Sequence, residues 1–169
     1  MSRASSGLRS GLILAASVFV VDQAAKFWAE RALNLYAPVE ITGFFNLTLV
    51  YNPGAAFSFL STAGGWQRWM FSGIALAAIT LILFWLSRLP REARLSILSL
   101  GLILGGAFGN LVDRLRLGKV VDFLDFHYAG LHWPAFNVAD AAITVGAVCL
   151  IIATFTEQSH HTADKERSR

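Results

Sequence analysis

The sequence predicts an all-α integral membrane protein with four transmembrane helices and a small periplasmic β-sheet platform. Hydrophobic residues make up 55% of the 169-residue chain and charged residues only 15%, whereas a soluble domain carries about 25% charged residues. The mean hydropathy is +0.54. Four apolar segments approach the roughly 17–25 residues that are needed to cross a bilayer. These features indicate a protein whose outer surface faces lipid.

The expected spans cover about residues 11–28, 67–87, 95–113 and 136–156. The second and third contain uncharged runs, Trp69–Ser87 and Leu95–Val112. The prediction of the first span is weaker, because Asp22 and Lys26 interrupt its apolar run. A cleaved signal peptide is the alternative interpretation of this segment. No small-residue cleavage site follows its apolar run, which favours a retained helix.

The distribution of Lys and Arg predicts the orientation, because these residues concentrate in cytoplasmic segments. Residues 1–10, 88–94 and 157–169 carry two, three and three of them. The intervening residues 29–68 and 113–132 together are twice as long but carry only two and three. We therefore expect both termini to be cytoplasmic and the two long loops to lie on the outer side of the membrane.

Composition also limits the domain organisation and the kinds of partner. Residues 1–157 are expected to form one transmembrane domain, and the polar residues 158–169 a disordered cytoplasmic tail. The formal net charge is only +3 and the basic residues are scattered, so no nucleic-acid partner is expected. The single cysteine, Cys149, excludes an internal disulfide and reads as a small buried hydrophobic residue.

Polar residues of the spans are expected to gather at one depth, near the outer surface. In the predicted topology the first and third spans end at that surface, and the fourth begins there. Charged groups in a bilayer cost a few kcal/mol or more and usually mark a functional site. The residues concerned are Asp22, Lys26, Asn110, Asp113, Arg114, Asn137 and Asp140.

Helical spacing adds detail to this cluster. Asp22 and Lys26 are four residues apart and can pair on one face, although an ion pair that merely lowers the cost of insertion is an alternative. Asn137 suits either a functional site or a helix N-cap. Small residues repeated every four positions allow close helix packing, and the third span has such a series, namely Gly101, Gly105 and Gly109.

The outer loops contain two segments with strand character. Phe44–Tyr51 and Val120–Tyr128 are rich in aromatic and β-branched residues. The sequence Asn52-Pro53-Gly54 suits a type II turn, with glycine supplying the positive φ. A simple turn is the alternative to a functional role for these residues.

Asp122 and Asp140 form a candidate catalytic pair. Two carboxyl groups close in space do not both ionise easily and therefore share a proton. The ionised group can take a proton from water while the protonated group donates to a peptide carbonyl. A purely structural role for both aspartates is the alternative. His127 and His132 lack zinc-like ligand spacing, so neither a metal nor another cofactor is expected.

Five blocks in order identify a family that this chain resembles: "VVDQAAK", "YNPGAAFS", "GGAFGNLVDR", "VVDF" and "FNVADAAI". The chain is similar to the bacterial lipoprotein signal peptidases (signal peptidase II), four-span aspartyl proteases of the bacterial cytoplasmic (inner) membrane. The resemblance implies that Asp122 and Asp140 are catalytic. The residues that it implies bind substrate or support the pair are Asp22, Lys26, Asn52, Gly54, Asn110, Arg114 and Asn137.

The resemblance also implies the reaction and its partners. The family removes signal peptides from diacylglyceryl-modified prolipoproteins by cleaving just before the lipidated cysteine, at the periplasmic side of the membrane. The expected partners are these prolipoproteins, membrane lipid and globomycin-type inhibitors. A small proton-coupled transporter or a non-enzymatic membrane scaffold is the alternative function, but a transporter needs polar groups near the bilayer midplane, and a scaffold needs no carboxylate pair.

Overall fold

Four long helices dominate the computed structural model, which describes the backbone of residues 4–54 and 65–167 and the side chains of residues 7–54 and 65–156. The helices are α1 (Ala4–Ala32), α2 (Trp66–Arg88), α3 (Arg94–Leu117) and α4 (Val138–Arg167). Each contains a segment long and apolar enough to cross a membrane, namely Gly7–Ala32, Trp66–Arg88, Arg94–Leu117 and Val138–Thr156. The predicted set of four spans is therefore confirmed, and most of these segments extend a few residues beyond the predicted bounds.

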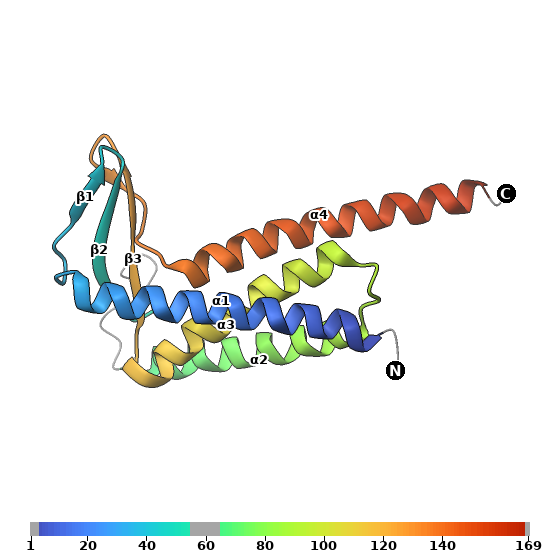
Figure 1. Cartoon of the computed structure of the whole chain (residues 1–169), viewed down its shortest axis with the longest axis horizontal. Coiled ribbons are helices and arrows are strands. Elements are labelled where there is room, and N and C mark those ends of the chain that lie inside the picture. Colours follow the sequence, from blue (N-terminus) through green and yellow to red (C-terminus); the bar gives the residue numbers. More distant parts are fainter. Residues whose placement is uncertain (1–3, 55–64, 168–169) are drawn as a thin grey trace.

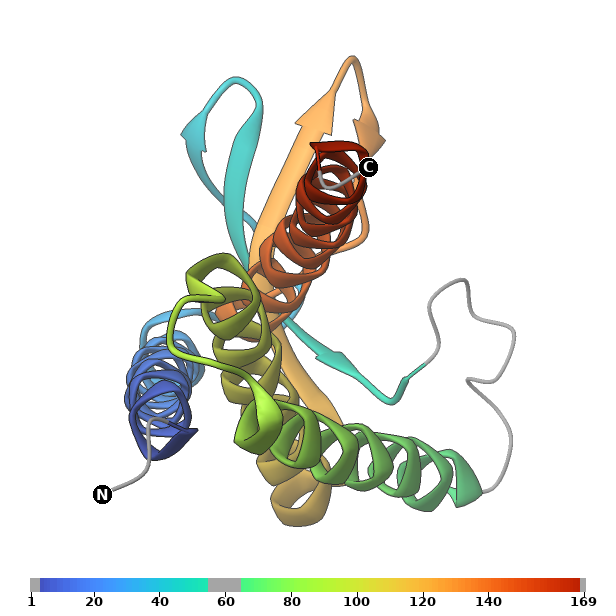
Figure 2. The same cartoon turned by 90° about the vertical axis from the view of Figure 1, so that its right-hand side faces the viewer.

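α3 is the central helix of the bundle. In its most apolar window 67% of residues are buried, compared with 17–22% in the other three helices. It packs against α1, α2 and α4, and Figure 2 shows it between them. Leu100 and Leu104 of α3 meet Ile79 and Leu86 of α2 in the hydrophobic core. The outer helices instead expose large apolar side chains, as expected for surfaces that face lipid.

The glycines of α3 allow α1 to approach closely. A Cβ atom at Gly101 would lie 3.0 Å from the carbonyl oxygen of Gly11, and one at Gly105 would lie 2.6 Å from that of Ala15. A Cβ atom at Gly109 would collide with the Asp22 carboxylate. The predicted small-residue series therefore faces α1 at all three positions, and Gly109 also meets Ala139 of α4.

A four-stranded antiparallel sheet lies at one end of the helices (Figure 1). Its order is β1 (Val39–Thr42), β2 (Phe45–Asn52), β3 (Val120–Tyr128) and β4 (Leu131–His132). β2 and β3 are the two predicted strands, whereas β1 and β4 were not predicted. The β3–β4 connection consists of Ala129 (φ 49°) and Gly130 (φ 81°), and positive φ angles at both residues are typical of a type I′ hairpin turn.

The last helix continues past the expected end of the fourth span. The backbone of α4 is helical to Arg167, whereas the span was expected to end at residue 156, and the disordered cytoplasmic tail of residues 158–169 stays a prediction. Extending an existing helix costs far less than nucleating a new one. The segment also contains Ala, Glu, Lys and Arg, which are good helix formers.

Candidate active site

Asp122 and Asp140 come from different elements and meet at the sheet end of the helices. Asp122 lies on β3 and is 1% exposed, whereas Asp140 lies in the first turn of α4 and is partly buried. Asn137 contacts both. Its Nδ2 donates to Asp122 Oδ1 at 2.6 Å, and its backbone N–H donates to Asp140 Oδ2 at 3.3 Å. The predicted pair therefore shares one bridging residue.

The N-terminus of α4 fixes this bridge. The Asp140 backbone N–H donates to Asn137 Oδ1 at 2.9 Å, which is the reciprocal of the bond between Asn137 N–H and Asp140 Oδ2. Such a pair of bonds is a capping box, which satisfies N–H groups that a helix start leaves free. The Ala139 N–H finds its acceptor in Asp22 Oδ1 at 2.9 Å. Asn137 therefore caps α4 and at the same time contacts both members of the candidate pair.

The turn after β2 supplies a second donor to Asp122. Asn52 Nδ2 donates to Asp122 Oδ2 at 3.0 Å, and Asn52 Oδ1 accepts the Gly54 N–H at 2.9 Å. Gly54 has a φ of 101°, in the region that only glycine adopts readily. The sheet register, in which Val50 lies opposite Asp122, brings Asn52 within reach. Residues 55–58 of the "YNPGAAFS" block lie outside the described residues.

A buried charge network lies behind Asp140. Lys26 Nζ is 2.9 Å from Asp22 Oδ2 and 2.8 Å from Asp113 Oδ2, and all three side chains are essentially inaccessible. Lys26 also donates to Asn110 Oδ1 at 2.9 Å. The Nδ2 of the same Asn110 donates to Asp140 Oδ1 at 2.7 Å. The predicted Asp22–Lys26 pair is confirmed, and it is connected to the candidate site through Asn110.

Two further members of the network were not assigned a role in the site. Asp113 was expected only as part of the outer polar cluster, and Gln23 was not predicted at all. Asp113 Oδ2 accepts the Val121 backbone N–H at 3.2 Å, which ties β3 to α3. Gln23 Nε2 donates to Asp113 Oδ1 at 3.0 Å. The spacing of Asp113, one helical turn after Asn110, was a usable signal, whereas an uncharged Gln23 gave none.

Arg114 completes the set of predicted residues. Its Nη1 donates to the Asn110 carbonyl oxygen at 3.3 Å, and its guanidinium lies 5.5 Å from the centroid of the Phe71 ring. It interacts electrostatically with Asp140 and Asp122. Among the described residues, no hydrogen-bond partner meets its buried Nε atom.

The surroundings of Asp122 favour its protonated form. Burial raises the pKa of Asp122 to about 7, and the charge of Asp140 acts in the same direction. Hydrogen bonds from Asn52 and Asn137 oppose this rise. Near neutral pH a proton donor therefore lies beside a second carboxyl group, which is the requirement for acid–base chemistry by a pair of carboxyl groups.

Asp125 provides a contrast on the same strand. It is 7% exposed, but it accepts a hydrogen bond from Asn46 Nδ2 at 3.1 Å and lies 2.9 Å from His132 Nδ1. It is therefore buried in a separate polar cluster. Within the described part of the chain, no group of three His, Cys, Asp or Glu side chains gathers as a metal-ligand set.

Comparisons with known proteins agree with this arrangement of elements. A family model described as "Signal peptidase (SPase) II" matches residues 14–156. A lipoprotein signal peptidase of Hydrogenovibrio crunogenus is 46% identical over 161 residues, which cover 95% of this chain and 94% of that protein. One from Pseudoalteromonas atlantica is 52% identical over 155 residues, which cover 92% and 94%.

A solved structure, "Bacterial membrane enzyme structure by the in meso method at 2.3 A resolution", has the same fold. Its TM-score is 0.78 at 28% identity, and the match covers 89% of this chain and 90% of that one. The family match and both relatives extend over nearly all of the helices and the sheet. The chain therefore belongs to the signal peptidase II family.

Proposed function

We propose that the chain is a membrane aspartyl endopeptidase that removes signal peptides from diacylglyceryl-modified prolipoproteins. The cut falls just before the lipidated cysteine. The observation that carries this proposal is the bridge from Asp122 through Asn137 to Asp140, two carboxyl groups held together at the sheet end of four apolar helices. The lipoprotein signal peptidases that the chain resembles are consistent with this substrate.

In the proposed mechanism, Asp122 and Asp140 act on one water molecule. The ionised carboxylate takes a proton from water as the oxygen attacks the scissile carbonyl carbon, and the protonated carboxyl donates to the carbonyl oxygen. When the C–N bond breaks, a carboxyl group returns a proton to the amine of the lipidated cysteine. The pair titrates as a unit, so the acid and base roles belong to the pair rather than to one residue.

The surrounding polar residues position this pair. Asn110 and Asn137 each donate to one carboxylate, and Lys26 offsets the buried negative charge behind them. Arg114 offers an Nε donor that has no hydrogen-bond partner among the described residues, and this donor suits a carbonyl oxygen of the substrate backbone. In this proposal a globomycin-type cyclic peptide occupies the same space and competes with the substrate.

The proposed topology has both termini in the cytoplasm and the carboxyl pair at the periplasmic surface. The distribution of Lys and Arg supports it. Among the described residues, the buried charged side chains all lie at the sheet end, where lipid and water adjoin in this topology. They are Asp22, Lys26, Asp113, Asp122 and Asp125. This one-sided placement argues against a transporter, which needs polar groups near the midplane.

Substitution of each aspartate with asparagine tests the proposal. Asp122→Asn and Asp140→Asn are expected to accumulate a diacylated prolipoprotein precursor on a gel, while the protein still inserts into membranes. Asp125→Asn is the matched control, because Asp125 is buried on the same strand but lies outside the pair. Continued processing by both variants of the pair would overturn the assignment.

A further inference from the structure

A cavity of about 860 Å³ lies at the end of the helices opposite the sheet. Its size falls within the roughly 300–1,000 Å³ that is typical of small-molecule sites. Arg94, which lines it, precedes Asn110 by 16 positions on α3, a separation of roughly 24 Å along the helix axis. The cavity is therefore distinct from the Asp122–Asp140 site.

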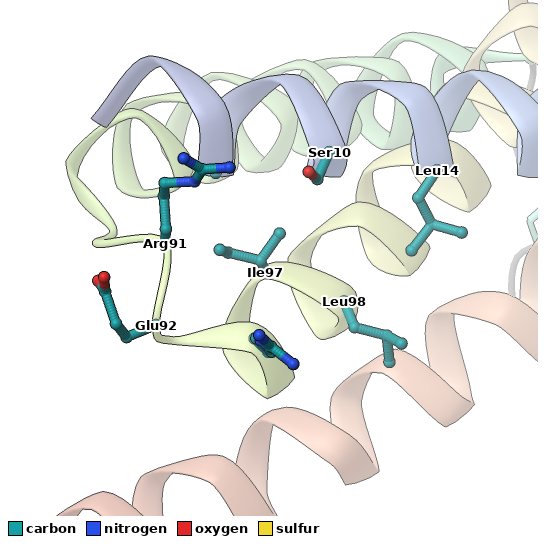
Figure 3. A pocket seen from close by; sticks show the side chains of 8 residues that line it. Ser10, Leu14, Arg91, Glu92, Ile97 and Leu98 are labelled. Carbon is teal, nitrogen blue, oxygen red and sulfur yellow. The ribbon is translucent and has the colours of Figure 1, made fainter. Parts of the chain in front are cut away.

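The walls of the cavity are amphipathic. Figure 3 shows α1 on one side, α3 behind and α4 beyond Leu98. Leu14 of α1 and Leu98 of α3 supply apolar surface, and three charged residues, Arg91, Glu92 and Arg94, lie around the α2–α3 connection. Arg94 also begins a membrane-spanning segment, so the charges lie where the span ends and the apolar surface lies within it.

The charged rim is suited to a phosphate group. Among the described residues, neither Arg91 nor Arg94 takes part in an ion pair. Guanidinium groups bind phosphate oxygens with strong, charge-assisted hydrogen bonds. The N-cap of α3, Ala93, provides no side-chain cap, and the first turn has no acidic residue. That helix start therefore adds its positive dipole end to the two arginines.

We propose that this cavity binds a membrane glycerophospholipid. The phosphate lies between Arg91 and Arg94, and one acyl chain follows Leu14 and Leu98 between α1 and α4. Glu92 supplies a counter-charge for an ammonium group, so a phosphoethanolamine headgroup satisfies all three charges. A signal peptide fits less well, because its positively charged N-terminal region would meet two arginines.

Native mass spectrometry of the full chain in detergent tests the site, with phosphatidylethanolamine, phosphatidylglycerol or inorganic phosphate added separately. Arg91→Gln and Arg94→Gln are each expected to weaken binding of the first phosphatidylethanolamine molecule about tenfold, as expected for the loss of a charge-assisted hydrogen bond. Glu92→Gln is expected to remove the preference for phosphatidylethanolamine over phosphatidylglycerol. Arg88→Gln is the matched control, because Arg88 stacks on Phe84 and lies outside the cavity lining.

A second pair of variants tests the acyl-chain half of the cavity. Leu14→Trp fills the apolar wall and is expected to weaken lipid binding about tenfold. Ile13→Trp places the same bulk on a face of α1 where the side chain is 68% exposed, and it should bind lipid as the unmodified protein does. Prolipoprotein cleavage by the Arg91 and Arg94 variants is expected to continue, which separates this test from that of the carboxyl pair.

Three results would overturn the proposal. The first is equal lipid binding by the cavity variants and their controls. The second is inorganic phosphate binding as tightly as phospholipid, which would remove any role for the apolar wall. The third is displacement of bound lipid by a signal peptide without a lipidated cysteine, which would assign the cavity to the substrate.

Discussion

Replacing Asn137 separates two roles that one side chain combines. Its Oδ1 caps α4 through the Asp140 N–H at 2.9 Å, and its Nδ2 donates to Asp122 Oδ1 at 2.6 Å. Asn137→Ser retains an oxygen that can cap the helix but loses the amide donor. Asn137→Ala loses both, so the difference between the two variants isolates the cap.

The magnitudes follow from the bonds that each variant loses. Above the pKa of about 7, where the Asp122 carboxylate is charged, a hydrogen bond to it contributes about 1.5–3 kcal/mol, so Asn137→Ser should lower the free energy of unfolding there by about 2 kcal/mol. It also removes the donor to the Val121 carbonyl oxygen at 3.2 Å. Loss of an N-cap costs about 1 kcal/mol, so Asn137→Ala should be about 1 kcal/mol less stable than Asn137→Ser.

Unfolding in detergent micelles measures the stability, and prolipoprotein cleavage measures the function. Both variants should cleave slowly, because Asp122 loses its shortest hydrogen bond. Removing that donor also favours the protonated form of Asp122, so any residual activity should persist to higher pH. Equal stabilities for the two variants, or full activity in both, would refute this account of Asn137.

Three further predictions concern stability. Lys26→Met leaves two buried carboxylates without their cation and should lower the free energy of unfolding by roughly 3–5 kcal/mol in detergent melts. An unchanged free energy of unfolding would contradict a stabilising role for Lys26 in the buried charge network. Gly105→Ala, whose Cβ would lie 2.6 Å from a backbone oxygen of α1, should cost about 1–3 kcal/mol. In Gly73→Ala the added Cβ meets none of the neighbouring described residues within 4 Å, and alanine is the better helix former, so this control should not destabilise the protein. Equal losses in the two variants would refute the close contact between α1 and α3. The pKa of Asp122 is about 7 in the folded protein against an ordinary 3.8, so the folded protein holds a proton that the unfolded chain loses over this range. The free energy of unfolding should therefore fall between pH 4 and 7 by about 4 kcal/mol relative to Asp122→Asn. A free energy of unfolding that rises over this range would contradict the raised pKa.

The sequence was most informative where the bilayer constrains it. A membrane span must be long and apolar, so the four helices could be located from composition alone. The same constraint makes a buried charge conspicuous, which is why Asp22, Lys26 and Asp140 stood out. The glycine spacing on α3 likewise predicted a close helix contact, although not that α1 was the partner.

The parts that were missed depend on contacts between distant segments. β1 and β4 are four and two residues long and owe their conformation to pairing with the neighbouring strands. Gln23 joins the site only because α1 and α3 meet at Gly109. For Asn137 the N-cap and the contact with the site were predicted only as alternatives, since the sequence does not reveal which β3 atom its amide reaches.

The pH dependence of kcat/KM for cleavage of a diacylated prolipoprotein tests the central claim most directly. If Asp122 and Asp140 share one proton while they activate water, the rate should pass through a maximum and fall tenfold per pH unit above the pKa of the pair. Because burial raises the pKa of Asp122 to about 7, this fall in the rate should begin near pH 7. A rate that stays level to pH 9, well above the pKa of about 7 for Asp122, would contradict the shared proton and the mechanism that rests on it.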